Sequence, residues 1–258
     1  IFFECKCVRI FDDFSAKLLK KTAETEKIDL SLSFHQTGML GNYSTTIFAD
    51  SEKTIFVHNH PNTYSLSKNL PLTKMVYLSS VGPDYVKIFS EIVNHCNNNK
   101  IPLAFNPASH QFNDEFDKYK IAVENSSYLF VNKKEAQKIL KAGKMEIKDL
   151  LTELKKLGSG VVILTDNTNG AYSFDGETAY YCPAYDLPVV QKTGAGDAFS
   201  SGFLSAVMSG KGIPEAMFSG SINAASVIAD TGPISGLLTR EKMDKIISGS
   251  PLPVVQIL

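Results

Sequence analysis

The residues best suited to chemistry lie in a glycine-rich turn that spans positions 192–199, Lys-Thr-Gly-Ala-Gly-Asp-Ala-Phe. Apolar residues follow at the spacing of one helix face, namely Phe199, Phe203, Leu204 and Val207. This pattern places Gly194, Ala195 and Gly196 in the first turn of a helix. There the main-chain N–H groups are unpaired and the helix dipole is positive, so the turn predicts an anion site.

Asp197 is an unusual residue for a site that only binds an anion, because its carboxylate would repel a phosphate at close range. It is well suited to accept a proton from a hydroxyl group. A phosphate-binding turn beside such a base is what phosphoryl transfer to an alcohol requires. Gly194 and Gly196 could instead serve close packing, but that alternative leaves Asp197 unexplained.

Composition limits the classes of function. The 258 residues are 43% hydrophobic and 21% charged, as in an ordinary globular protein. The net charge is −1, with 26 basic and 27 acidic residues, which argues against a nucleic-acid partner. No apolar run approaches the roughly 20 residues that a membrane span needs, and the first residues do not resemble a signal peptide. We therefore expect a cytoplasmic protein with no membrane partner.

Short apolar strands alternate with helices from Met75 onward, which predicts an α/β fold with a mostly parallel sheet covered on both faces. The expected strands are 75–78, 103–105, 128–131 and 161–164, and the expected helices are 83–97, 133–141, 147–157, 196–208 and 214–230. A loop is expected after 103–105. Ligands of such sheets bind at the carboxyl ends of the strands, where Asn106, Asn132 and Thr165 stand.

A β-hairpin precedes these units. Thr45–Ala49 and Thr54–Val57 read as two strands around a polar turn, and we interpret the hairpin, about 44–60, as a lid. Its exposed edge offers a surface on which a second subunit could pair to form a homodimer.

Several motifs in register resemble the ribokinase-like carbohydrate and nucleoside kinases, the phosphofructokinase B family. Thr193 to Phe199 resembles the family's D-T-x-G-A-G-D-x-F signature. Other similar segments are Asn106-Pro107-Ala108, Asn132-Lys133-Lys134-Glu135, Thr165 to Gly170, and Asn223-Ala224-Ala225. The resemblance covers nearly the whole chain. It implies one ribokinase-like domain over 1–258, a three-layer α/β sandwich with a small β lid.

The resemblance also implies the roles of the glycine-rich turn. Asp197 would deprotonate the acceptor hydroxyl, while the amides of Gly194, Ala195 and Gly196 would hold the charge on the transferred phosphoryl group. The lid would close over the acceptor and exclude water.

ATP and Mg²⁺ are the cofactors that the resemblance implies. Thr165, Gly170 and Asn223 would line the nucleotide site, and Asn132 and Glu135 would organise Mg²⁺ through water. Two alternatives remain open at this point. Asn132 and Glu135 could form only a capping box at the start of a helix, and Asn223 could simply face solvent.

The chain departs from the family pattern in two places. Gln191 and Lys192 stand where the family usually has Asp and Thr, and because that Asp helps bind a monovalent cation, the sequence gives little reason to expect activation by potassium. Nothing at the start matches the family's opening strand, so we expect the chain to lack the family's N-terminal segment.

The leading hypothesis is an ATP-dependent kinase that phosphorylates an alcohol group of a sugar or a related small molecule. The Asn-Pro-Ala loop favours a sugar, whereas lid aromatics such as Phe48 and Phe56 could stack on the base of a nucleoside. The alternatives are therefore a nucleoside kinase, or a catalytically impaired homologue that only binds nucleotide. An oxidoreductase is disfavoured, because no G-x-G-x-x-G segment follows an early strand.

Overall fold

A computed structural model describes residues 9–10, 14–35, 43–49, 52–58, 70–79 and 81–257. The chain divides into two compact units. One comprises Ile1–Pro71 with Val81–Glu91, and the other comprises Leu72–Ser80 with Ile92–Leu258. The expected site residues from Asn132 to Asn223 all belong to the second unit. The prediction that 1–258 forms one domain stays a prediction.

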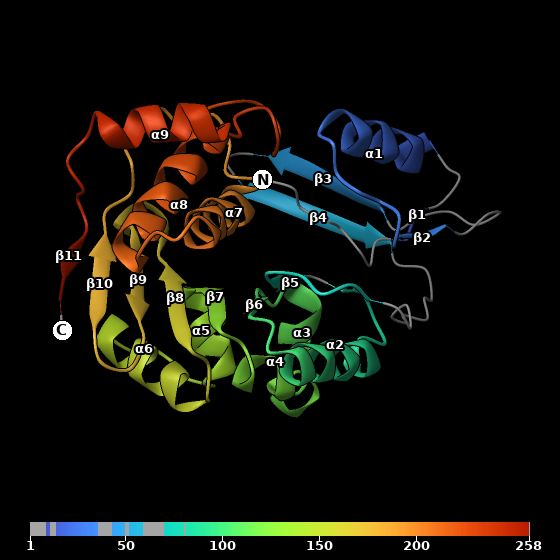
Figure 1. Cartoon of the computed structure of the whole chain (residues 1–258), viewed down its shortest axis with the longest axis horizontal. Coiled ribbons are helices and arrows are strands. Elements are labelled where there is room, and N and C mark those ends of the chain that lie inside the picture. The colour runs from blue at the N-terminus through green and yellow to red at the C-terminus, as the bar shows by residue number, and fades with distance from the viewer. Residues whose placement is uncertain are drawn as a thin grey trace. The chain divides into compact units, whose positions relative to one another are not determined.

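The second unit is built on a seven-stranded sheet in the order β11-β10-β9-β8-β7-β6-β5. Strands β5, β6, β7, β8 and β10 run in one direction, and β9 and β11 run in the other. The predicted mostly parallel sheet is confirmed (Figure 1). The strands are β5 (Val76–Leu78), β6 (Leu103–Phe105), β7 (Tyr128–Asn132), β8 (Val161–Thr165), β9 (Ala171–Phe174), β10 (Ala179–Cys182) and β11 (Val255–Gln256).

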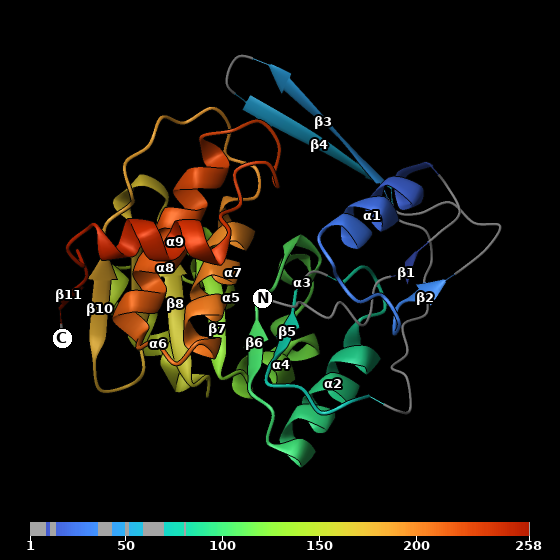
Figure 2. The ribbon, with the colours of Figure 1, turned by 45° about the horizontal axis from the view of Figure 1, so that its top comes forward.

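Helices cover both faces of this sheet, as Figure 1 shows. Helices α7 (Ala195–Met208) and α8 (Ile213–Ile228) lie on one face, and α5 (Lys133–Ile139) and α6 (Ile147–Lys156) on the other. Alternating strand residues serve the two layers, so Phe130 packs with Phe203 of α7 while its neighbours Leu129 and Val131 are buried elsewhere. Helix α9 (Arg240–Ser248) lies outside α8 (Figure 2). This is the expected three-layer sandwich.

Two glycines allow α7 and α8 to pack closely. A Cβ atom on Gly202 would lie 2.7 Å from the main-chain oxygen of Ser219, and one on Gly220 would lie 2.9 Å from the oxygen of Phe199. Both distances are too short for a real side chain. The approach of α8 therefore fixes the position of α7, the helix that begins at the glycine-rich turn.

The segment after β6, expected to be a loop, contains short helices instead. These are α3 (Ser109–Asn113), the 3₁₀ turn Phe116–Lys118 and α4 (Lys120–Glu124). Helices of this length are too short to show a 3.6-residue period, so the pattern could not reveal them. The buried ring of Tyr119 holds this segment together, since it contacts Phe112 and Phe116 edge-on. Burial also raises the pKa of Tyr119 to about 12.

In the first unit, the expected hairpin is confirmed as β3 (Tyr43–Ala49) and β4 (Glu52–His58), paired from Tyr43↔His58 to Ala49↔Glu52. Positions 50–51 and 59–60 of the predicted lid lie outside the described residues. The other elements are α1 (Phe14–Thr25), β1 (Arg9–Ile10) and β2 (Phe34–His35), while α2 (Val86–Asn99) begins in the first unit and ends in the second.

The α7–α8 contact can be tested by adding one methyl group. Gly202→Ala should lower the free energy of unfolding by about 1–3 kcal/mol, because the new Cβ atom meets main chain that cannot move aside. Urea unfolding measures the change. Gly143→Ala is the matched control, since a Cβ atom there would meet nothing within 4 Å. Equal stability of the two variants would contradict the packing argument.

Candidate active site

The two glycines of the turn at the start of α7 have different structural roles. Gly194 precedes the helix with a left-handed φ of +87°, and a Cβ atom there would lie 2.8 Å from the Cβ atom of Pro233. This position needs glycine for its conformation and its packing. A Cβ atom on Gly196 would meet nothing within 4 Å. The packing alternative therefore explains Gly194 but not Gly196, beside which there is open space.

Asp197 lies in the first turn of α7 and its side chain is exposed. It does not point into the hydrophobic interior. Enough protein nevertheless surrounds the carboxyl group that desolvation raises its pKa above the ordinary value. A raised pKa brings a carboxylate closer to the range in which a general base works best at neutral pH.

Asn132 and Glu135 form the capping box that the sequence offered as an alternative. The side-chain oxygen of Asn132 accepts from the main-chain N–H of Glu135 at 3.0 Å, and Oε2 of Glu135 accepts from the N–H of Asn132 at 2.8 Å. Burial raises the pKa of Glu135, and the charge of Asp197 raises it further, against the lowering effect of its bonds to Asn132. Glu135 therefore lies within electrostatic reach of Asp197.

The capping box does not exclude a metal role, because it occupies only one oxygen of Glu135. Within the described part of the chain, no three or more His, Cys, Asp and Glu side chains gather as a preformed metal cage. An ion held at Asn132 and Glu135 would take most of its ligands from water and phosphate oxygens, which is how Mg²⁺ usually binds.

Thr165 and Gly170 bracket the turn that follows β8. Thr165 pairs with Asn132 of β7, so the two predicted motifs lie side by side at the carboxyl ends of neighbouring strands. The turn closes when the N–H of Asp166 donates to the oxygen of Gly170 at 2.8 Å. Gly170 has a φ of +88°, and a Cβ atom there would overlap the main-chain oxygen of Cys182. Only glycine fits this position.

An ion pair that the sequence did not reveal joins this turn to α5. Nζ of Lys133 lies 3.4 Å from Oδ2 of Asp166, and the same oxygen accepts from the side-chain amide of Asn169 at 3.1 Å. Asp166 is buried. The ends of β7 and β8 are therefore linked by side chains as well as by the sheet.

Asn223 does not face solvent, and that alternative is wrong. The residue is only 5% exposed. Its amide nitrogen donates to the oxygen of Ala198 at 2.8 Å and to Oγ of Ser201 at 3.2 Å, while its oxygen accepts from the N–H of Leu238 at 3.1 Å. Asn223 thus joins α8 to the first turns of α7 and to the segment before α9. Its contact with a nucleotide stays a prediction.

Gln191 precedes the glycine-rich turn, and the main-chain N–H groups of Val190 and Gln191 both donate to the oxygen of Ile228 at the end of α8, at 2.8 and 3.1 Å. Its Nε2 atom is buried and has no hydrogen-bond partner among the described residues. Lys192 is exposed. The expectation about potassium stays a prediction.

One residue at this candidate site, Tyr77 of β5, was not predicted from the sequence. Its hydroxyl accepts from the side-chain amide of Asn106 at 3.0 Å, and the charge of Asp197 acts on it. The only signal in the sequence was its position near the carboxyl end of a predicted strand, where ligands of such sheets bind.

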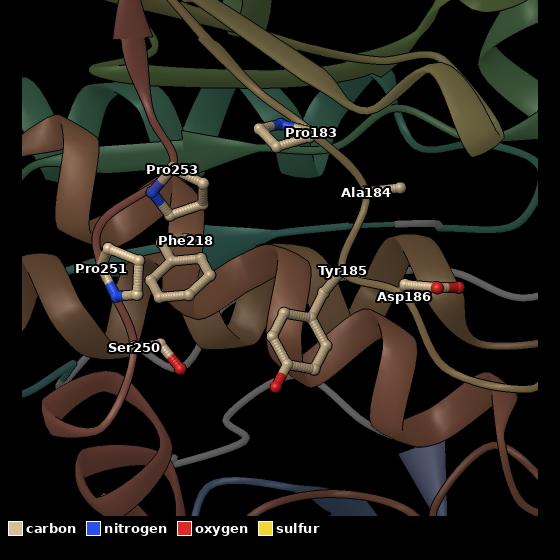
Figure 3. A pocket seen from close by; sticks show the side chains of 8 residues that line it. All are labelled: Pro183, Ala184, Tyr185, Asp186, Phe218, Ser250, Pro251 and Pro253. Atoms are coloured by element: carbon tan, nitrogen blue, oxygen red, sulfur yellow. The ribbon is translucent and has the colours of Figure 1, made fainter.

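A separate hollow of about 220 Å³ lies between the segment after β10 and the segment before β11. Pro183, Tyr185, Phe218 and Pro253 are among the residues that line it (Figure 3). None of the predicted site residues lines it. It is small for a nucleotide and mostly apolar, so it does not compete with the start of α7 as the candidate site.

Among the described residues, no helix combines the length and the apolarity that crossing a membrane requires.

Comparison with solved structures supports the fold. Ribokinase from Arabidopsis thaliana, complexed with ribose and ATP, superposes with a TM-score of 0.80 at 17% identity over 95% of this chain and 81% of that one. Ribokinase from Thermotoga maritima gives 0.77 at 19% identity over 93% and 80% of the two chains.

Comparison by sequence gives the family. Ribokinase of Bacillus subtilis is 23% identical over 210 residues, or 78% of this chain and 67% of the relative. Cytidine kinase of Thermococcus kodakarensis is 25% identical over 162 residues, or 62% and 56%. The matched stretches thus span about two thirds or less of these relatives. The model of the pfkB family carbohydrate kinases matches residues 9–240, and the chain belongs to that family.

Proposed function

We propose that this protein is an ATP-dependent kinase that transfers the terminal phosphoryl group to an alcohol group of a sugar or of a nucleoside. The observation that carries the proposal is the setting of Asp197. Its exposed carboxylate lies in the first turn of a helix, next to open space at Gly196 and within electrostatic reach of Glu135. This arrangement supports a base and an anion site that act on the same reacting groups.

In the proposed mechanism, Asp197 accepts the proton of the acceptor hydroxyl as its oxygen attacks phosphorus. The first main-chain bond of α7 runs from the N–H of Ala198 to the oxygen of Gly194 at 2.8 Å. The N–H groups before Ala198 therefore have no acceptor inside the helix. The amides of Gly194, Ala195 and Gly196 supply donors and the positive end of the dipole for the charge on the phosphoryl group.

The residues present fit ATP and Mg²⁺ as cofactors. The open space at Gly196 leaves room for a phosphate group, and the turn closed by Gly170 beside Thr165 presents main chain at the same sheet edge. Asn132 and Glu135 would hold Mg²⁺, which neutralises phosphate charge when bound. Asn223 would support the nucleotide side by joining α8 to α7.

A sugar is the favoured acceptor, and a nucleoside is the alternative. Both names occur among the relatives, ribokinase at 23% identity and cytidine kinase at 25%. The Asn-Pro-Ala segment that resembles ribokinases favours the sugar. The cytoplasmic location expected from the sequence stays a prediction.

The direct test of this function is ADP release from Mg·ATP by the full chain, measured across a panel of sugars and nucleosides. We expect one class of acceptor to accelerate ADP release well above the rate with water alone. Calorimetry that shows Mg·ATP binding with no acceleration by any acceptor would contradict a kinase and favour the catalytically impaired homologue.

Asp197→Asn should lower the rate of phosphoryl transfer by about 10²- to 10⁴-fold, the usual contribution of a positioned base, and leave nucleotide binding nearly intact. Stopped assays measure the rate of phosphoryl transfer, and calorimetry measures nucleotide binding. Asp149→Asn is a matched control, because Asp149 is also the third residue of its helix, α6. A variant at Asp197 that retains most of its activity would remove this residue from the mechanism.

The raised pKa of Asp197 also predicts a pH dependence. The base must be ionised, so kcat/KM should fall as the pH decreases through a pKa higher than 3.8, the ordinary value for aspartate. The residual activity of Asp197→Asn should lack this acidic limb. If the activity of the wild type and of Asp197→Asn fell at the same acidic pH, another group would be responsible for the pH dependence.

Glu135→Gln separates the capping role from the metal role. Glutamine can still accept from the N–H of Asn132, so the free energy of unfolding should change by less than about 0.5 kcal/mol. The Mg²⁺ concentration for half-maximal activity should rise about 10-fold, because the negative charge is lost. Glu146→Gln, at the N-cap of α6, is the control. An unchanged Mg²⁺ dependence would show that Glu135 has only the capping role.

The hairpin β3–β4 supports the proposal of a homodimer. By its register, the exposed residues Tyr43, Ile47 and Phe56 share one face of a two-stranded ribbon. Such a ribbon is marginally stable by itself, so a second copy pairing there would stabilise it. Light scattering should show a dimer that Phe56→Glu dissociates, whereas Leu72→Glu, at an exposed position outside the hairpin, leaves it intact. A monomer at every concentration would contradict this assembly.

A further inference from the structure

Tyr77 and Asn106 come from neighbouring strands and form a side-chain pair near Asp197. Tyr77 belongs to β5, and Asn106 directly follows β6. Nδ2 of Asn106 donates to the Tyr77 hydroxyl at 3.0 Å, and the main-chain N–H of Asn106 donates to the oxygen of Leu78 at 2.9 Å. Two hydrogen bonds thus fix Asn106 against the end of β5, and the amide in turn fixes the phenol.

The phenol lies against the first turns of α7. Oγ of Ser200 donates to the main-chain oxygen of Gly196 at 3.0 Å, so Ser200 is held over the turn that carries Asp197. Desolvation raises the pKa of Tyr77 and the Asp197 charge raises it further, against the lowering effects of Asn106, Ser200 and Ser79. The phenol is therefore surrounded by polar groups of the candidate active site and stays protonated.

Packing alone does not account for this hydroxyl. The residue is 36% exposed, and a phenylalanine would cover the same part of the sheet without bringing a polar group among Asn106, Ser200 and a carboxylate. Because Nδ2 of Asn106 donates to the phenol, the phenolic O–H is directed elsewhere. The side-chain oxygen of Asn106 accepts from none of the described residues. The pair therefore offers one acceptor, the amide oxygen of Asn106, and one donor, a phenolic O–H that also has Ser200 and Ser79 as neighbours.

We propose that Tyr77 and Asn106 form an acceptor subsite that binds a second hydroxyl of the substrate, close to the hydroxyl that is phosphorylated. This inference rests on the proposed function, since it takes Asp197 as the base. A hydroxyl is the group that both accepts from a phenol and donates to an amide oxygen. Groups so close to the reacting oxygen belong to the sugar, in a free sugar and in a nucleoside alike. The subsite thus selects polyols over simple alcohols.

The test is a cycle of enzyme and substrate changes, read out as binding. Calorimetry in the presence of ADP and Mg²⁺ would use D-ribose with its 2-deoxy and 3-deoxy forms, and cytidine with its 2′-deoxy and 3′-deoxy forms. The wild type should bind one deoxy form about 5- to 20-fold more weakly than its parent, the value of one hydrogen bond. Tyr77→Phe should lose the same factor on the parent and nothing more on that deoxy form.

Two further variants complete the design. Asn106→Ala should show the same non-additive loss, which keeps the test available if Tyr77→Phe folds poorly. Tyr181→Phe is the control, because it removes the hydroxyl of a tyrosine in β10 whose ring contacts Tyr172 of β9, with ring centroids 5.0 Å apart. It should bind every probe as the wild type does. Melting temperatures show whether each variant is folded.

The outcomes separate this inference from the proposed function. Three results would each overturn the subsite. In the first, the affinity losses from Tyr77→Phe and from the missing hydroxyl add for every deoxy form. In the second, Tyr77→Phe binds as the wild type does, and in the third, the wild type binds no probe. ADP release judges the kinase separately. Transfer to an acceptor combined with additive losses would leave the function standing without the subsite. Non-additive binding without any transfer would leave the subsite and remove the kinase.

Discussion

The close contact between α7 and α8 is the constraint on which the rest of the site depends. Gly202 and Gly220 let the two helices approach to a distance that any side chain would prevent, and Asn223 joins them with hydrogen bonds to Ala198 and Ser201. The first turn of α7 is thereby held against the sheet. Gly194, with its left-handed backbone packed on Pro233, fixes the direction in which the chain enters the helix.

Electrostatics converge on the same turn. Asp197 has a pKa raised by desolvation, and its charge in turn raises the pKa of Glu135, in the first turn of α5, and of Tyr77 in β5. Three elements, α7, α5 and β5, therefore contribute ionisable groups, and those of α5 and β5 lie within electrostatic reach of Asp197. The parallel sheet brings them together, because strands that run the same way end at the same edge.

The sequence predicted well those features that depend only on residues close together in the chain. The capping box at the start of α5, for example, forms because the side chains of Asn132 and Glu135 each accept from the main-chain N–H of the other residue. The glycine-rich turn at the start of α7 was predicted because the helix spacing and the glycine pattern coincide there.

Features that depend on tertiary packing were not predictable. Helices α3 and α4 are too short to show a period, and the buried position of Asn223 follows from the helix beside it rather than from its neighbours in sequence. Tyr77 was missed because its bond to Asn106 joins residues 29 positions apart. A tyrosine in a strand carries no local sign of such a partner.

The most direct measurement is a crystal structure of the full chain with ADP, Mg²⁺, aluminium fluoride and the preferred acceptor. We expect the fluoride group to accept hydrogen bonds from the amides at Gly194, Ala195 and Gly196, and the acceptor hydroxyl to lie within hydrogen-bond distance of the carboxylate of Asp197. A fluoride group bound elsewhere, or an acceptor out of reach of Asp197, would contradict the proposed role of this turn.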